Sequence, residues 1–142
     1  MAFATQQQLL AVEDVSQFQH LVDINIELQR AESAILRLLS SLWWQRFLQN
    51  NPHIKPGKMQ ANLFDVNQWN NPTIYYALAY FILPKIEQAS GVNTRERAAI
   101  YHNKWEYDFR HLLDLGINYD LQGTLHQEVW DEEDPGYIRL KK

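Results

Sequence analysis

The segment from residue 73 to 89 is apolar on almost every side. It begins after Thr73 with IYYALAYFIL, in which no residue is charged. A surface helix carries one apolar stripe, so a helix that is apolar all round has to be buried. The uncharged run is about half the roughly 20 residues needed to cross a membrane. The sequence therefore predicts a helix at the centre of a small soluble bundle.

The flanks of this segment carry start and stop signals. Asn71 followed by Pro72 predicts the helix start, because asparagine caps a helix and proline is tolerated in its first turn. Pro84 removes one backbone hydrogen bond, so a kink is expected near Tyr80. Gly91 closes the helix after Ser90.

Two further long helices are predicted on either side of the central one. Apolar residues recur at steps of three and four from Ile24 to Leu42, which predicts an amphipathic helix from Asp23 to about Leu48. The last helix is expected at 94–115, with Asn93 and Glu96 as a reciprocal cap and Gly116 as its stop. Thr5 is expected to cap a short helix, Gln6 to Glu13.

The remaining segments are predicted to lack long helices. Residues 51–71 are rich in Pro, Asn and Gly and are interpreted as a long loop with one turn near 59–64, a loop length that often carries contacts. The fold class is therefore all-α: three long helices and a short N-terminal one, with a long loop. The domain division is a bundle at 1–116 and an extended, partly strand-like tail at 117–142.

Composition bounds the functions of this chain. Its 142 residues match one domain, and its net charge of -4 argues against a basic surface that grips nucleic acid. It has no cysteine, which fits a reducing cytoplasm and removes thiolate chemistry. The N-terminal sequence lacks the basic start and apolar run of a secretory signal.

Catalytic motifs are not found. The five histidines share no metal-ligand spacing, and the best one-turn pair, His102 with Glu106, is more often a surface contact than a metal site. Phosphate-binding loops and nucleophile elbows are also missing. We expect no catalytic residue, no metal and no cofactor, with a small metal-dependent enzyme as the least favoured hypothesis.

Aromatic residues make up 13% of the chain, and Trp and Tyr are typical of protein interfaces. Adjacent Trp43 and Trp44 point about 100° apart on a helix, so one of them is expected at the edge of the core. A wide core and an anchor for a neighbouring subunit explain this equally well. Phe64 and Trp69 are the interface candidates in the loop. The tail candidates are Tyr119, Leu125, Trp130, Tyr137, Ile138, Arg139, Leu140, Lys141 and Lys142.

The order of these features resembles the head-tail connector, or adaptor, proteins of long-tailed bacteriophages. The similarity is in a long early helix with Glu27 and the residues from Arg30 to Ile35, and in the proline-led aromatic helix from Pro72 to Leu78. It continues through Tyr101, Trp105, Glu106, Leu112 and Leu113, then Tyr119, Asp120, Gly123 and Glu128, and a tail that ends in basic residues. The loop at 51–71 is longer, and the turn at Asp120 less acidic, than in the family.

The resemblance implies a virion structural protein. Such adaptors form a dodecameric ring below the portal, extend the DNA channel and bind another neck or tail protein, so duplex DNA passes through without tight contact. It implies heterologous contacts between copies, a location in the virion neck, and the host cytoplasm during assembly, without a membrane. The alternative is a small acidic helical interaction or inhibitor module.

Overall fold

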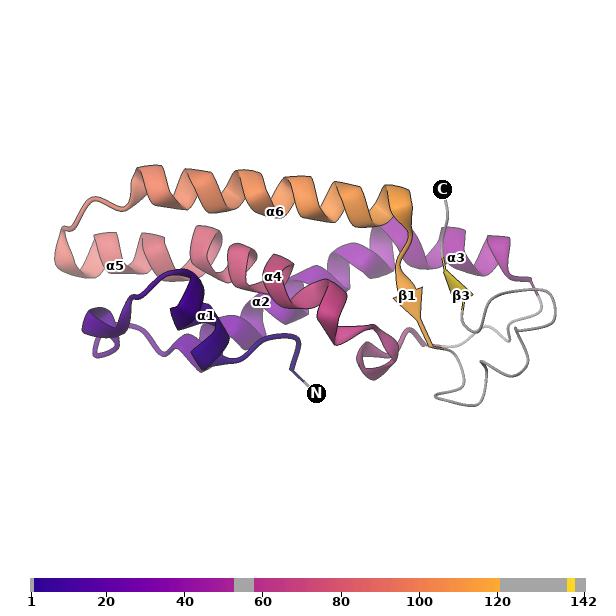
Figure 1. The fold of residues 1–142 in the computed structure, drawn as a ribbon, viewed down its shortest axis with the longest axis horizontal. Helices are drawn as coiled ribbons and strands as arrows, with labels where there is room; N and C mark the ends of the chain where they lie inside the picture. The colour runs from indigo at the N-terminus through magenta and orange to yellow at the C-terminus, as the bar shows by residue number, and fades with distance from the viewer. Residues whose placement is uncertain (1, 53–57, 121–137, 140–142) are drawn as a thin grey trace.

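The computed structural model describes residues 2–52, 58–120 and 138–139, the last two by their backbone only. Three long helices form the molecule, which confirms the all-α bundle (Figure 1). The first consists of α2 (Ile24–Leu39), the π-helical turn η2 (Ser40–Trp44) and α3 (Gln45–Asn50). The second consists of α4 (Val66–Ala77), the π-helical turn η4 (Leu78–Ile82) and α5 (Leu83–Ser90), and the third is α6 (Arg95–Leu115).

Short elements complete the fold. Helix α1 (Gln6–Val12) starts at the capping box of Thr5 and Gln8, as the sequence predicted for Thr5. Two 3₁₀ turns follow, η1 (Ser16–Phe18) and, in the loop, η3 (Ala61–Leu63). Strand β1 (Asn118–Tyr119) pairs antiparallel with β3 (Ile138–Arg139).

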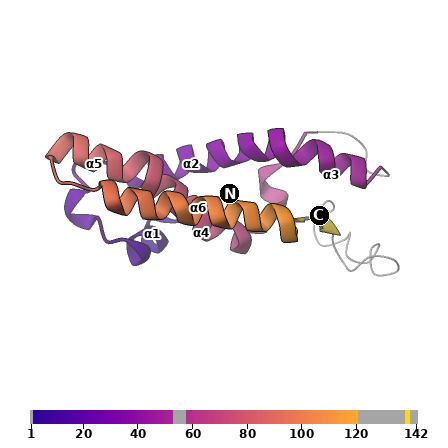
Figure 2. The same cartoon turned by 90° about the horizontal axis from the view of Figure 1, so that it is seen from above.

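The helix built from α4, η4 and α5 is the centre of the bundle. Both α2 and α6 pack against it (Figure 2). The N-terminal arm, residues 2–22, covers a third side, where Leu9, Val15 and Val22 share a core with Ile74 and Leu78. The apolar character of this helix is thus explained by neighbours on three sides.

The start of the central helix differs from the prediction. Asp65, and not Asn71, is the N-cap, and its Oδ1 accepts a hydrogen bond from the Asn67 amide at 3.0 Å. Pro72 therefore lies inside α4, at a cost of about 3 kcal/mol. The longer helix carries Trp69 into the core at 0% exposure, and burying about 200 Å² of indole contributes about 5 kcal/mol. Burial of Trp69 outweighs the cost of the proline, so the helix begins at Val66, inside the predicted loop.

The predicted disturbance before Pro84 takes the form of the π-helical turn η4. Proline has no amide hydrogen, so the normal ladder is interrupted one turn before it, near Tyr80. A π turn bonds residue i to i+5, which adds one residue to the turn and shifts the faces that follow.

The start of α6 is also corrected. Its N-cap is Thr94, and the Asn93 side chain accepts from the Arg95 amide at 3.0 Å, so the reciprocal cap with Glu96 is not the one used. The Thr94 hydroxyl instead donates to the carbonyl of Leu83 at 2.7 Å. This buried bond fixes the turn between α5 and α6.

Residues 117–120, which directly follow the predicted domain boundary at Gly116, pack into the bundle. Ile117 and Tyr119 are 0% and 1% exposed. The Tyr119 hydroxyl accepts from the Gln60 amide at 2.9 Å, and the Asp120 amide donates to the Leu63 carbonyl at 2.8 Å. Hydrogen bonds thus hold residues 117–120 against the loop before α4.

The N-terminal arm is fastened to α6 through one carboxylate. Glu13 accepts a 2.6 Å hydrogen bond from the Tyr101 hydroxyl and forms a 2.7 Å ion pair with Arg97. Burial, and then the bond to Glu13, raise the pKa of Tyr101 well above its ordinary value. The arm is therefore held by polar contacts as well as by its apolar residues.

Replacing Tyr101 with phenylalanine is expected to lower the free energy of unfolding by about 1.5–3 kcal/mol at pH 7, the usual value of a hydrogen bond to a charged group. The Tyr101 pKa is raised by folding, so this contribution is fully present below pH about 10 and is lost as pH rises further. Urea unfolding of both proteins at pH 7 and above pH 10 measures it. An equal stability difference at the two pH values would contradict the assignment.

Candidate protein-binding groove

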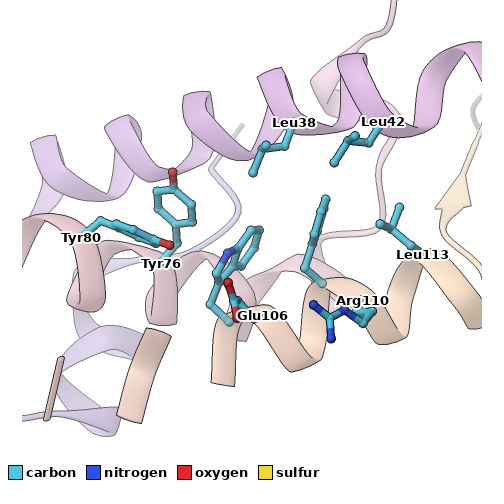
Figure 3. Close-up of a pocket in the computed structure, with 9 residues that line it drawn as sticks. Leu38, Leu42, Tyr76, Tyr80, Glu106, Arg110 and Leu113 are labelled. Atoms are coloured by element: carbon cyan, nitrogen blue, oxygen red, sulfur yellow. The ribbon is translucent and has the colours of Figure 1, made fainter. Parts of the chain in front are cut away.

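An open groove runs between the helix of α2 and η2 on one side and α6 on the other (Figure 3). Its volume is about 470 Å³. Leu38 and Leu42 point into it from α2 and η2, and Leu113 and the ring of Phe109 come from α6. Tyr76 and Tyr80 of the central helix close one end.

The groove lies on a side of the central helix that the described chain leaves partly uncovered. The arm fills the opposite side, between α2 and Tyr101 of α6. Tyr76 and Tyr80 are one turn apart, so they share the side that faces the groove, and their ring centroids are 4.4 Å apart. An apolar helix with one open side presents a surface suited to another chain.

Two large residues of the groove lining are about half exposed. Leu42 is 53% exposed and Tyr80 is 41% exposed. Burial in the bundle raises the pKa of Tyr76 and of Tyr80, so both hydroxyls are neutral hydrogen-bonding groups at pH 7. The charged residues at the rim are Glu106 and Arg110.

The exposure of Leu42 overturns its place in the predicted apolar stripe. Up to Ile35 the stripe is buried as expected, but from there the core positions follow at steps of four, at Leu39, Trp43 and Phe47, and not at Leu38 and Leu42. Leu42 lies in the π turn η2 itself, and together with Leu38 of α2 it lines the groove. Tyr80 lies in the other π turn, η4, so each π turn contributes one residue to this site. Such turns are common at functional sites.

The four aromatic interface candidates lie inside the core of their own chain. Trp43 and Trp69 are 0% exposed, Phe64 is 3% and Trp44 is 8% exposed. Their rings pack on each other and on Tyr119, with centroids 4.9 to 5.6 Å from the Tyr119 ring for Phe64, Trp44 and Trp43. The structure therefore favours the wide core over the waiting anchor for the Trp doublet, with Trp44 at its edge.

The tail candidates divide into two groups. Tyr119 is buried, and the backbone of Ile138 and Arg139 pairs with it and with Asn118 of the same chain. The side chains of these two residues, and Leu125, Trp130, Tyr137, Leu140, Lys141 and Lys142, lie outside the described part. Strand addition to a neighbour stays a prediction for them.

The ionisable groups near the groove include the predicted one-turn pair of His102 and Glu106. His102 Nε2 lies 3.8 Å from a Glu106 carboxylate oxygen, and both side chains are well exposed. Within these ranges no group of three or more His, Cys, Asp or Glu residues is placed to hold a metal ion. Among the same residues, no helix has the length and apolarity of a membrane span.

The patterns considered in the sequence did not predict this groove, although the sequence contains a signal for it. Tyr76 and Tyr80 are hydroxyl-bearing rings one turn apart on one side of the uncharged run 74–83. Such rings prefer a border between apolar and wet surroundings, so the pair marks the helix side that neighbours leave open.

Comparison with known proteins gives no relative: no family model, no curated protein and no solved structure matches this chain.

Proposed function

We propose that this protein assembles with other chains through the groove, as a subunit of the head-tail adaptor ring of a tailed phage. The observation that carries the proposal is the uncovered side of the central apolar helix, lined by Leu38, Leu42 and Tyr80. An apolar groove between two helices suits the apolar face of a partner helix. Its charged residues, Glu106 and Arg110, are better suited to orienting that partner than to catalysing a reaction of a small molecule.

The energetics favour a partner at this site. Completing the burial of Leu42 and Tyr80 contributes about 1 kcal/mol each, because full burial of such side chains is worth about 1.5–3 kcal/mol and each is about half exposed. Both residues are already held on packed helices, so little conformational freedom is lost on binding.

Net charge supports the adaptor role. A chain of net charge -4 has little attraction for phosphates, so a ring of such subunits lets duplex DNA slide without tight contact. The partners proposed beside the copies in the ring are the portal and another neck or tail protein, and the proposed location is the virion neck. The resemblance to adaptor proteins supports these partners.

Light scattering of the purified chain tests the proposal. We expect a mass many times the 16.8 kDa of one chain, consistent with a closed ring, at high protein concentration. Electron microscopy of the chain mixed with portal rings is then expected to show it at one end of the portal. A chain that stays at 16.8 kDa throughout, and leaves portal rings bare, would instead indicate the small acidic interaction or inhibitor module.

A further inference from the structure

We propose that residues 121–134 of one copy bind in the groove of the next copy. This inference rests on the proposed function and assigns the two surfaces through which copies in the ring meet. Residues 121–134 are called the acidic segment. They lie outside the described residues and are characterised by their sequence alone.

The two ends of the groove differ in charge (Figure 3). Glu106 lies toward the end that Tyr80 closes, and its carboxylate is 3.8 Å from His102 Nε2. Arg110 lies one turn further along α6, toward the end lined by Leu113. In the described part of the chain the Arg110 guanidinium forms no ion pair. The Leu113 end of the groove therefore presents an unpaired positive charge.

A second arginine extends the opposite wall at the same end. Arg46 of α3 follows Leu42 of the groove edge by four residues on the same long helix. Leu38, Leu42 and Arg46 share one side of this helix, because each directly precedes one of its core positions, which are Leu39, Trp43 and Phe47. Arg46 is exposed and, among the residues that the structure describes, it also has no ion pair. A chain that leaves the groove at this end thus meets two cations, which favour an acidic partner.

The acidic segment combines apolar anchors with a run of negative charge. Leu121, Leu125 and Val129 recur at steps of four, the spacing of neighbours on one side of a helix. Acidic residues fill the positions from 131 to 134, and no Lys or Arg occurs from 121 to 138. The segment therefore matches a groove that is apolar along its length and basic at one end.

The lengths of the two surfaces also match. The lining that α6 contributes runs from Trp105 to Leu113, a distance of about 12 Å along the helix. Leu121 and Val129 are separated by the same number of residues, so as a bound helix their anchors span about 12 Å as well. With Leu121 at the end that Tyr80 closes, the acidic run emerges beside the two arginines.

The groove and the acidic segment are different surfaces of one chain. Contact between two different surfaces is head-to-tail, and it closes into a ring when the rotation between copies allows it. The opposite charges fix the direction in which the segment enters the groove. The assignment therefore suits the ring that the proposed function requires.

Engineered cysteines test the contact directly, because the native chain has none. One full-length variant carries Leu42→Cys at the groove edge, and a second, distinguishable by an affinity tag, carries Val129→Cys in the acidic segment. Leu42 is 53% exposed, so its substitution removes no core contact. The control replaces Leu42→Cys by Ile26→Cys, a residue of α2 that is 52% exposed and outside the groove lining.

After mild oxidation of the mixed variants, we expect the disulfide between positions 42 and 129 to form about tenfold faster than the control disulfide between positions 26 and 129. The reason is the high effective concentration of groups held at a formed contact. A rate equal to that of the control would overturn the inference. A chain that carries both Leu42→Cys and Val129→Cys and closes the disulfide within itself, while the mixed variants react at the control rate, would also overturn it.

The charge at the basic end is tested with the same disulfide. Arg110→Gln in the chain that carries Leu42→Cys is expected to slow formation of the 42–129 product about fivefold, because the acidic run loses a cation. Lys104→Gln removes the same charge from the same helix outside the groove lining and is expected to leave the rate unchanged. Equal rates for the two substitutions would contradict the placement of the acidic run.

These results are separable from the test of the proposed function. Large particles in light scattering without enrichment of the 42–129 product would overturn the assigned surfaces and leave the adaptor ring standing. Enrichment of that product, with particles of only two or three chains and bare portal rings, would support the head-to-tail contact and contradict the ring.

Discussion

Replacing Trp43 with alanine is expected to lower the free energy of unfolding by about 3–5 kcal/mol, the usual cost of emptying a large aromatic site. Trp43 is 0% exposed and its ring contacts Phe47, Phe64 and Tyr119, with centroids 4.6 to 5.6 Å away. These partners come from α3, the loop before α4, and β1. The substitution therefore removes the contact that joins three separate segments.

Urea unfolding followed by circular dichroism measures the effect of the Trp43 substitution. The control is Ile26→Ala on the same long helix, where 52% exposure leaves an expected change within about 0.5 kcal/mol. A loss below about 1 kcal/mol for Trp43→Ala would contradict the role of this ring in the core.

Replacing Tyr119 with alanine is expected to cost a similar amount, about 3–5 kcal/mol, although the residue follows the last long helix. Its ring packs against Trp43, Trp44 and Phe64, and burial raises the pKa of its hydroxyl, which accepts from the Gln60 amide. Tyr119→Phe keeps the ring and removes only the hydroxyl, for an expected loss of about 0.5–1.5 kcal/mol.

The same unfolding measurement decides whether residues 117–120 belong to the bundle. A large loss for Tyr119→Ala with a small loss for Tyr119→Phe places this segment in the core. An effect within about 0.5 kcal/mol for both variants would return the segment to an independent tail, as the boundary after Gly116 assumed.

The fold was predictable where local patterns and packing agree. The all-round apolar character of 74–83 located the central helix, and the Thr5 and Gly116 signals set two helix ends. Asn71 and Pro72 misled because local start signals contribute about 1 kcal/mol each, while burial of Trp69 a few residues earlier contributes more.

The candidate site was less predictable for a geometric reason. The predicted stripe takes a step of three from Ile35 to Leu38, whereas the core continues at steps of four, at Leu39 and at Trp43 in the π turn Ser40–Trp44, which leaves Leu42 exposed at the groove. Composition likewise could not separate buried from exposed aromatic residues: Trp43 and Tyr107 are alike in a count, yet one is 0% and the other 68% exposed. Only the packing of α2, α6 and the arm shows which side of the central helix is left open.

The central claim is that this open side binds protein, and sedimentation velocity of two matched variants tests it most directly. Leu42→Lys places a charge at the groove edge, whereas Ile26→Lys places the same charge on the same long helix at nearly equal exposure, 52% against 53%. We expect Leu42→Lys to sediment as a single chain at concentrations where the native protein and Ile26→Lys form large particles. Equal sedimentation of the two variants, whether both assembled or both single, would contradict the claim.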